Sequence, residues 1–281
     1  MNNKQYITSS FGVKVPFLIY GTAWKKEYTA FMVEKAILEG FRGIDTALQP
    51  KHYDEKQVGD ALSKLKEQGI NREDLYLQTK FTPLAGQDKN NIPYDKNLPI
   101  EVQIFQSFET SKKNLQTSYL DTLILHSPIE PYDLFLRAWK AMESIYEAKG
   151  VLQLGISNCY DLELLKRLYN DVNIKPAIVQ NRFHKESEYD AKIRNWCDEN
   201  NIIYQSFWTI TANAHILNSD TLTDIAQSKQ KTPAQILFRY LNQKGVVPLT
   251  GTTSKTHIQE DLSILEFELQ DEELCLIDKL L

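Results

Sequence analysis

Three polar residues of different chemistry stand where apolar runs of the sequence end. Asp45 follows "RGI", Lys80 closes "LYLQTK" and His126 closes "DTLILH". Singly, each has a simple structural explanation, because an aspartate can begin a turn, a lysine is usually solvated and a histidine can be a satisfied interior residue. Together they suggest a shared site, since a charged Asp45 and Lys80 in one pocket would need each other as partners.

A histidine and a tyrosine stand side by side a few residues after Asp45. His52 and Tyr53 occur in "QPKHYDEKQVG". An imidazole and a phenol can each give or take a proton. Either side chain is therefore a candidate for acid–base chemistry near the aspartate.

Short β-branched, apolar runs alternate with longer segments of helical period, which indicates parallel strands joined by right-handed crossovers. Eight strands favour a closed (β/α)8 TIM barrel over an open doubly wound sheet, and "YGTAWKK" lacks the GxGxxG pattern that such a sheet would carry. Before them, "YITSSFGVKVPF" predicts a β-hairpin that closes the barrel bottom. The predicted strands are 17–21, 42–46, 75–79, 121–126, 152–157, 177–181, 202–207 and 245–249, and the predicted helices include 31–38, 102–115, 133–148, 162–171, 191–199 and 233–243.

The active site of such a barrel lies at the carboxyl ends of its strands. Asp45, Lys80 and His126 then face one pocket. Other polar or aromatic residues end the remaining strands, namely Ser157, Asn158, Gln180, Phe207 and Thr250 to Thr253.

The composition narrows the classes of function. The 281 residues suit one large α/β domain, with 42% hydrophobic and 25% charged residues. Three separated cysteines argue against disulfides and a zinc site, and a net charge of -5 with scattered Lys and Arg offers no surface for nucleic acid or membrane. We expect a single domain over 1–281, a small-molecule partner, no metal and a monomer. Because "MNNKQYITSS" lacks the apolar core of a secretory signal, we expect a cytoplasmic protein.

Five ordered motifs resemble the aldo-keto reductases, the NAD(P)H-dependent barrel enzymes that reduce aldehydes and ketones. The motifs are "GFRGIDTA" with "HYDEKQVGDAL", "LYLQTKF", "LDTLILHSP", "AWKAMESIYEAKGVLQLGISN" and "KPAIVQN", and the similarity spans essentially the whole chain. The resemblance implies a catalytic tetrad of Asp45, a tyrosine, Lys80 and His126.

The chemistry of carbonyl reduction requires those residue types. Hydride delivery to a carbonyl carbon leaves an alkoxide, which needs a proton and a polar site for its charge. A tyrosine hydroxyl is a weak acid at neutral pH, and an ammonium from Lys80 would favour its phenolate. Asp45 would hold the lysine, while His126 would hydrogen-bond the carbonyl oxygen and orient the substrate.

The tyrosine departs from the commoner family pattern, in which it follows the aspartate by five positions. Pro50 stands there, and an ungapped comparison from "EKQVG" places His52 rather than Tyr53 on the usual tyrosine. Counting leaves both residues open. A neutral histidine beside a cationic lysine has a lowered pKa and is a poorer proton source. We therefore predict Tyr53 as the donor and His52 as a neighbour at the pocket mouth.

The resemblance also implies residues for a nicotinamide cofactor. Ser157, Asn158 and Gln180 would hydrogen-bond its carboxamide, and Phe207 would stack on its ring. The alternative for Ser157 and Asn158 is a cap for the next helix. The predicted cofactor contacts are Gly21, Thr22, Asp45, Ser157, Asn158, Gln180, Phe207, Thr250, Gly251, Thr252, Thr253 and His257.

The segment after the eighth predicted strand leaves the coenzyme open. Gly251 and His257 stand where many relatives have a lysine and an arginine for the 2′-phosphate, and Asp261 replaces a usual asparagine. A phosphate could instead dock where a helix begins near Ser254, with Lys255 close by. We predict NADPH, with NADH as the alternative.

The main hypothesis is NAD(P)H-dependent reduction of small aldehydes or ketones. We expect substrate contacts from Trp24, His52, His126 and Trp208, with the long loop 81–100 as a further wall. One alternative is a non-catalytic dinucleotide-binding barrel that acts as a redox sensor or partner protein. Another is a barrel with different chemistry, such as a phosphate-handling isomerase, which depends on the fold alone.

Overall fold

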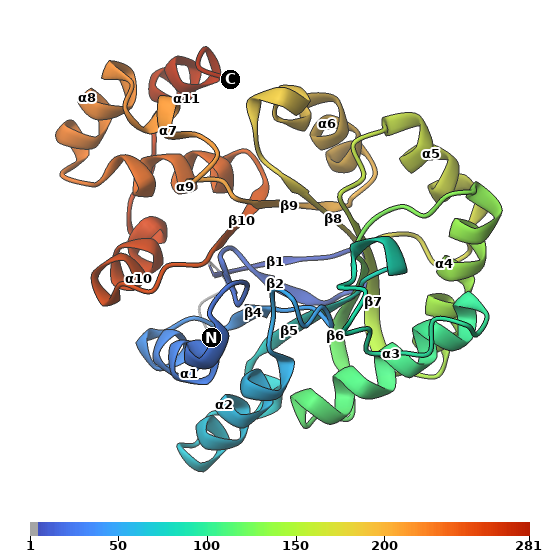
Figure 1. Ribbon diagram of the computed structural model, residues 1–281. Coiled ribbons are helices and arrows are strands. Elements are labelled where there is room, and N and C mark those ends of the chain that lie inside the picture. Colours follow the sequence, from blue (N-terminus) through green and yellow to red (C-terminus); the bar gives the residue numbers. More distant parts are fainter. Residues whose placement is uncertain (1–4) are drawn as a thin grey trace.

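Eight parallel strands close into a barrel in the computed structural model, which describes residues 5–281 (Figure 1). Neighbours in the barrel follow chain order, and the last strand pairs with both its predecessor and the first. All eight predicted strands and the predicted barrel are confirmed. The strands are β3 (Ile19–Gly21), β4 (Gly43–Asp45), β5 (Tyr76–Phe81), β6 (Leu120–Leu125), β7 (Val151–Ser157), β8 (Ile178–Arg182), β9 (Ile203–Phe207) and β10 (Val246–Thr250).

Helices form a ring around the barrel (Figure 1). The six predicted helices are confirmed as α1 (Thr29–Glu39), α3 (Ile100–Leu115), α4 (Tyr132–Glu147), α5 (Leu162–Asp171), α6 (Ala191–Glu199) and α9 (Pro233–Gln243). Their ends follow local chemistry: at α9, Thr232 accepts from the backbone N–H of Gln235, whose side chain accepts from Thr232 in return. The others are α2 (Glu55–Glu67), α7 (Ala214–Leu217), α8 (Asp220–Lys229), α10 (Lys255–Leu262) and α11 (Asp271–Asp278). Within residues 5–281, none of these helices is long and apolar enough to cross a bilayer.

A hairpin of β1 (Tyr6–Thr8) and β2 (Lys14–Pro16) closes the bottom of the barrel, as predicted. Val13 and Val15 are buried in one apolar cluster with inward-facing strand residues. The Ser9 hydroxyl, in the turn of the hairpin, donates to Gln153 Oε1 of β7 at 2.5 Å. These contacts attach the hairpin to the barrel interior.

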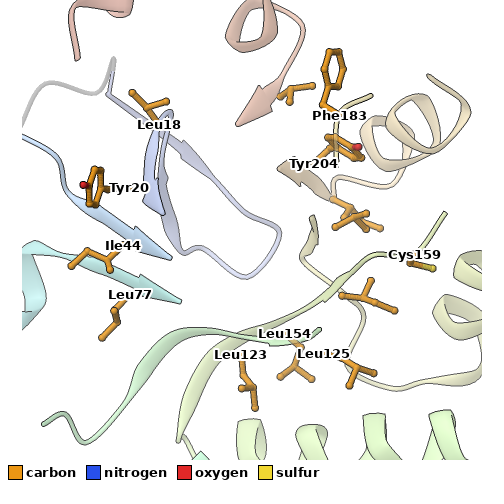
Figure 2. Close-up of a cluster of buried hydrophobic side chains, with 14 of the residues drawn as sticks. Leu18, Tyr20, Ile44, Leu77, Leu123, Leu125, Leu154, Cys159, Phe183 and Tyr204 are labelled. Atoms are coloured by element: carbon orange, nitrogen blue, oxygen red, sulfur yellow. The ribbon is translucent and has the colours of Figure 1, made fainter. Parts of the chain in front are cut away.

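Side chains alternate along each strand between the barrel interior and the layer under the helices. In β8, Ile178 belongs to the small interior cluster and Val179 to the large cluster between strands and helices. Figure 2 shows Leu123, Leu125 and Leu154 of β6 and β7 in that outer layer. Most of the apolar core thus lies outside the barrel, which leaves interior positions for polar side chains.

Candidate active site

A buried ion pair lies at the carboxyl ends of β4 and β5. Lys80 Nζ donates to Asp45 Oδ1 at 2.6 Å and to the carbonyl oxygen of Thr46 at 2.8 Å. The residues are 1% and 3% exposed. Burial lowers the pKa of Lys80, while the negative charge of Asp45 acts to raise it. The two charges therefore stabilise each other where either alone would be costly to bury.

Tyr53 lies over this pair. Its ring centroid is 5.2 Å from Lys80 Nζ and 6.2 Å from the His126 ring centroid. The position follows from a turn, because the backbone N–H of Tyr53 donates to Gln49 O at 3.0 Å and the next residue, Asp54, caps α2. Burial, and then the Asp45 charge, raises the pKa of Tyr53 above its ordinary value. This direction is opposite to the one that the Lys80 charge alone would produce, so the hydroxyl keeps its proton at neutral pH.

His126 approaches Tyr53 from the end of β6. Its Nδ1 hydrogen-bonds the Thr82 hydroxyl at 2.6 Å, whereas Nε2 has no partner within residues 5–281. Burial, with the Lys80 charge second, holds the pKa of His126 well below its usual range. The imidazole is therefore neutral near pH 7.

His52 points elsewhere, although it is adjacent to Tyr53 in the chain. Its ring lies 4.0 Å from the ring of Trp24, centroid to centroid, and its Nδ1 is 2.8 Å from Gln49 Oε1. Trp24, His52 and Tyr53 line a cavity of about 350 Å³. The structure thus places Tyr53 beside Lys80 and His126 and leaves His52 at the mouth.

The loop after β5 packs against the segment that carries Tyr53. Gln49 Nε2 donates to Gly86 O at 2.6 Å, and Gln87 Nε2 donates to Leu48 O at 2.9 Å. Tyr94, farther along the loop, donates its hydroxyl hydrogen to Thr82 O at 2.8 Å. The loop therefore supports both the Tyr53 turn and the partner of His126.

The residues expected to contact a nicotinamide carboxamide gather beside His126. Asn158 Nδ2 donates to His126 O at 2.8 Å, and the Ser157 hydroxyl donates to Gln180 O at 2.6 Å. Asn158 has a left-handed φ of 52°, which asparagine tolerates better than most residues. The helix-cap alternative for Ser157 and Asn158 is wrong, because Asp161 caps α5 by accepting from two backbone N–H groups.

A glutamine network lies beneath the ion pair. Gln78 Nε2 and Gln180 Nε2 both donate to Asp45 Oδ1, at 2.7 and 3.0 Å. Both also donate to Gln205 Oε1, at 2.9 Å each. Sequence reasoning missed Gln78 and Gln205, although each stands at an inward position of its strand. Three strands thus fix the orientation of one carboxylate.

Lys25 is a further candidate that sequence reasoning missed, and its only signal is its place just after the first barrel strand, in "YGTAWKK". It is 5% exposed, and its Nζ donates to Gly251 O at 2.8 Å. Burial lowers the pKa of Lys25 to about 8. It forms no ion pair within residues 5–281. A buried cation beside the end of β10 fits the phosphate of a dinucleotide, so the donor set suits such a cofactor.

The other residues expected around a dinucleotide lie at the ends of β3 and β10. A Cβ added at Gly21 would be 3.5 Å from Thr250 O, and Thr22 donates twice to Asp45 O. The Thr250 hydroxyl donates to buried Asp261, whose pKa burial raises to about 6.

Residues at the start of α10 already have partners within the protein. Thr252 Oγ1 accepts from the backbone N–H of Ser254, while Thr253 and His257 are exposed. Lys255, expected near a phosphate, instead pairs with Glu39 at 3.1 Å. Lys25 is therefore the better placed cation.

Phe207 is the last residue of β9 and Trp208 follows it. Phe207 is partly buried against the interior cluster, and Trp208 is 48% exposed. The Arg182 guanidinium carbon lies 4.2 Å from the Trp208 ring centroid. Both aromatic residues are therefore on the same end of the barrel as Tyr53.

Comparison with known proteins finds the same family by sequence and by structure. The family model described as "Aldo/keto reductase family" matches residues 17–281. The chain is 31% identical to the 9,11-endoperoxide prostaglandin H2 reductase of Trypanosoma cruzi, covering 99% of this chain and 92% of that protein. It is 30% identical to the glyoxal reductase of Bacillus subtilis, covering 88% and 82%. The crystal structure of an aldo/keto reductase from Brucella melitensis has a TM-score of 0.83 at 26% identity, covering 98% and 97%.

Proposed function

The chain belongs to the aldo/keto reductase family, and on that premise we propose that it catalyses the NADPH-dependent reduction of small aldehydes or ketones, with Tyr53 as proton donor. The family consists of oxidoreductases of aldehydes and ketones that use nicotinamide cofactors. The observation that carries the proposal is the position of Tyr53. Its ring centroid lies 5.2 Å from Lys80 Nζ and 6.2 Å from the ring centroid of His126.

Tyr53 has the properties of a general acid for this reaction. A bound nicotinamide cofactor supplies the hydride, and negative charge then develops on the carbonyl oxygen. The raised pKa of Tyr53 keeps its hydroxyl protonated before the reaction. The Lys80 ammonium stabilises the phenolate that remains after proton transfer, and Asp45 keeps that ammonium in place.

His126 orients the carbonyl group. Its low pKa keeps the imidazole neutral, and in the tautomer that this mechanism uses, the Thr82 hydroxyl donates to Nδ1 and the ring proton is on Nε2. That N–H is available to donate to the carbonyl oxygen. Tyr53 and His126 thus provide two polar contacts for one oxygen atom.

Five side chains hold the cofactor in this proposal. Ser157, Asn158 and Gln180 match the donors and acceptor of a carboxamide, and Phe207 offers an aromatic face. Lys25, buried next to Gly251, supplies positive charge for a phosphate. Exposed His257 and Lys255 add little fixed charge, so NADH is the second coenzyme to test.

The experiment is the initial rate of NADPH oxidation, and separately of NADH oxidation, with aromatic aldehydes and α-keto aldehydes. We expect aldehyde-dependent oxidation by the wild type, at least about 100-fold slower turnover for Tyr53→Phe, and unchanged cofactor affinity. His52→Gln is the matched control and should keep most of the turnover. If Tyr53→Phe were as active as the wild type, Tyr53 would not be the donor. Cofactor binding by the wild type without any aldehyde-dependent oxidation would favour a redox sensor or partner protein.

A further inference from the structure

Arg182 is the last residue of β8 and lies on the inner side of that strand. The alternation is set by its neighbours, because Ile178 joins the interior cluster and Gln180 bonds Asp45. Residue 182 follows with the same period of two. Asn181, between them, faces outward and donates to the carboxylate of Asp190 at 2.7 Å. The Arg182 side chain therefore begins one layer above Gln180, at the open end of the barrel.

The register places Arg182 level with the expected reaction site. Arg182 pairs with Phe207, as Gln180 pairs with Gln205 one layer below. Its backbone N–H donates to the Tyr160 hydroxyl at 3.1 Å, and that hydroxyl donates to Asn158 Oδ1 at 3.4 Å. One tyrosine thus connects Arg182 to a residue beside His126.

The guanidinium group of Arg182 has no anionic partner. Within residues 5–281 it forms no ion pair and none of its N–H groups donates to an acceptor. Its Nε is buried, so that donor has lost water without gaining another acceptor. The carboxylate of Asp190 is bonded on the other side of the strand, by Asn181 and by the Tyr204 hydroxyl at 2.9 Å.

Trp208 holds the guanidinium in position. The Arg182 Cζ lies 4.2 Å from the Trp208 ring centroid, in a cation–π contact. Stacking orients the planar fork of donors and leaves its edge free for a second group. A guanidinium that is stacked, partly desolvated and unpaired matches the two oxygens of a carboxylate or phosphate.

We propose that Arg182 and Trp208 form a binding site for an oxyanion, a carboxylate or phosphate group of a molecule bound at the catalytic end. The substrate class then includes aldehydes and ketones that carry a carboxylate some distance from the carbonyl group. The alternative source of the oxyanion is the phosphate of the cofactor. This proposal rests on the proposed function, because it takes this end of the barrel as the place of reaction.

The first test compares a charged aldehyde with a neutral one of similar shape. The probes are 4-carboxybenzaldehyde and methyl 4-formylbenzoate, and the measured quantity is the ratio of their kcat/KM values. Arg182→Leu should reduce the preference for the charged aldehyde about ten-fold, because a charge-assisted pair of hydrogen bonds is lost. Arg182→Lys should restore part of it, since the charge remains but the fork does not. Lys192→Leu, on the exposed side of α6, removes an equal charge and should leave the ratio unchanged.

The second test identifies the source of the oxyanion. The dissociation constant of NADPH is measured by calorimetry for the wild type and Arg182→Leu. A weaker NADPH complex with an unchanged aldehyde ratio would support the site and assign it to the cofactor's phosphate. If Arg182→Leu changes neither the aldehyde ratio nor NADPH binding, while its melting temperature equals that of the wild type, the proposal is overturned.

A third measurement separates this proposal from the proposed function. Benzoate is titrated into the protein by calorimetry, which needs no turnover. A wild type that binds benzoate and an Arg182→Leu variant that does not would support the oxyanion site even if no aldehyde were reduced. Equal benzoate binding by both, together with an unchanged aldehyde ratio and an unchanged NADPH dissociation constant, would contradict it.

Discussion

The barrel interior and the outer layer are built from the same strands but differ in chemistry. Inside, Lys80 and Asp45 form an ion pair above the glutamine network. Outside, strand side chains such as Leu123 (Figure 2) form an apolar cluster with helix side chains such as Trp139 of α4. One residue step along a strand separates the two environments.

The two regions therefore have different roles, stability for the outer layer and chemistry for the barrel interior. Burial of apolar area drives folding at about 25 cal/mol per Å², and most of that burial is in the outer layer. Polar groups inside are tolerated because they are paired, so they can hold charge where a carbonyl group would react. Substitutions in the outer layer should therefore affect stability alone, and those inside should affect activity first.

Lys80→Met should have the largest effect and would test whether the separation holds at the ion pair. Turnover should fall at least about 100-fold, because the phenolate of Tyr53 loses its stabilising charge. The free energy of unfolding should also fall, by about 3–5 kcal/mol, since Asp45 is left buried and unpaired. Steady-state kinetics and urea unfolding measure the two effects. Wild-type turnover in this variant would remove Lys80 from the mechanism.

Trp139→Ala is the matching change in the outer layer. Trp139 is fully buried on α4, and its Nε1 donates to Ile174 O at 2.9 Å. The cavity should lower the free energy of unfolding by about 3–5 kcal/mol, while kcat/KM of the folded protein stays at the wild-type value. Trp139→Phe, as the control, should lose less. A large change in kcat/KM for either variant would contradict the claim that the outer layer affects stability alone.

Glu55 is a buried acid of the outer layer, and its contribution to stability should depend on pH. It accepts hydrogen bonds from Thr79 and Ser111, its Oε2 has no partner within residues 5–281, and burial raises its pKa to about 7. Because the folded pKa lies above the unfolded value of 4.5, the folded state binds the proton more tightly. Its contribution to stability is therefore full below pH 4.5 and is lost as the pH rises through 7.

Glu55→Gln tests the direction of this pH dependence of stability. Relative to the wild type, the variant should become more stable by about 3 kcal/mol between pH 4.5 and pH 8, on the scale of 1.4 kcal/mol per pKa unit. Urea unfolding at several pH values measures the difference, in which other titrating groups cancel. A difference that does not change with pH would mean that Glu55 has an ordinary pKa.

Gln78→Leu should have the smallest effect, and it probes the network under the ion pair. Asp45 loses one of three donors and Gln205 loses partners, which should cost about 1–3 kcal/mol of stability. Turnover should fall several-fold and the pH profile of kcat should shift, because the orientation of the carboxylate below Lys80 changes. Cofactor affinity should stay the same. An unaltered pH profile would mean that Gln78 has only a structural role.

Much of the fold and part of the site followed from local sequence patterns. Runs such as "LYLQTK" predicted both β5 and the place of Lys80 at its end. The prediction of helices was less complete, because α2, α7 and α8 were not assigned beforehand. Arg182 was missed because an arginine after an apolar run is by itself as consistent with a solvated strand end as with a binding site.

The sequence by itself determined the barrel, its strand ends and the placement of Asp45, Lys80 and His126, because strand period and strand order act locally and converge by topology. Only the tertiary structure decided that Tyr53 turns toward Lys80 while His52 turns toward Trp24. It also decided that Lys25 reaches Gly251 across more than two hundred residues of chain. Turn conformation and contacts between distant segments depend on how loops pack on one another, which local composition does not specify.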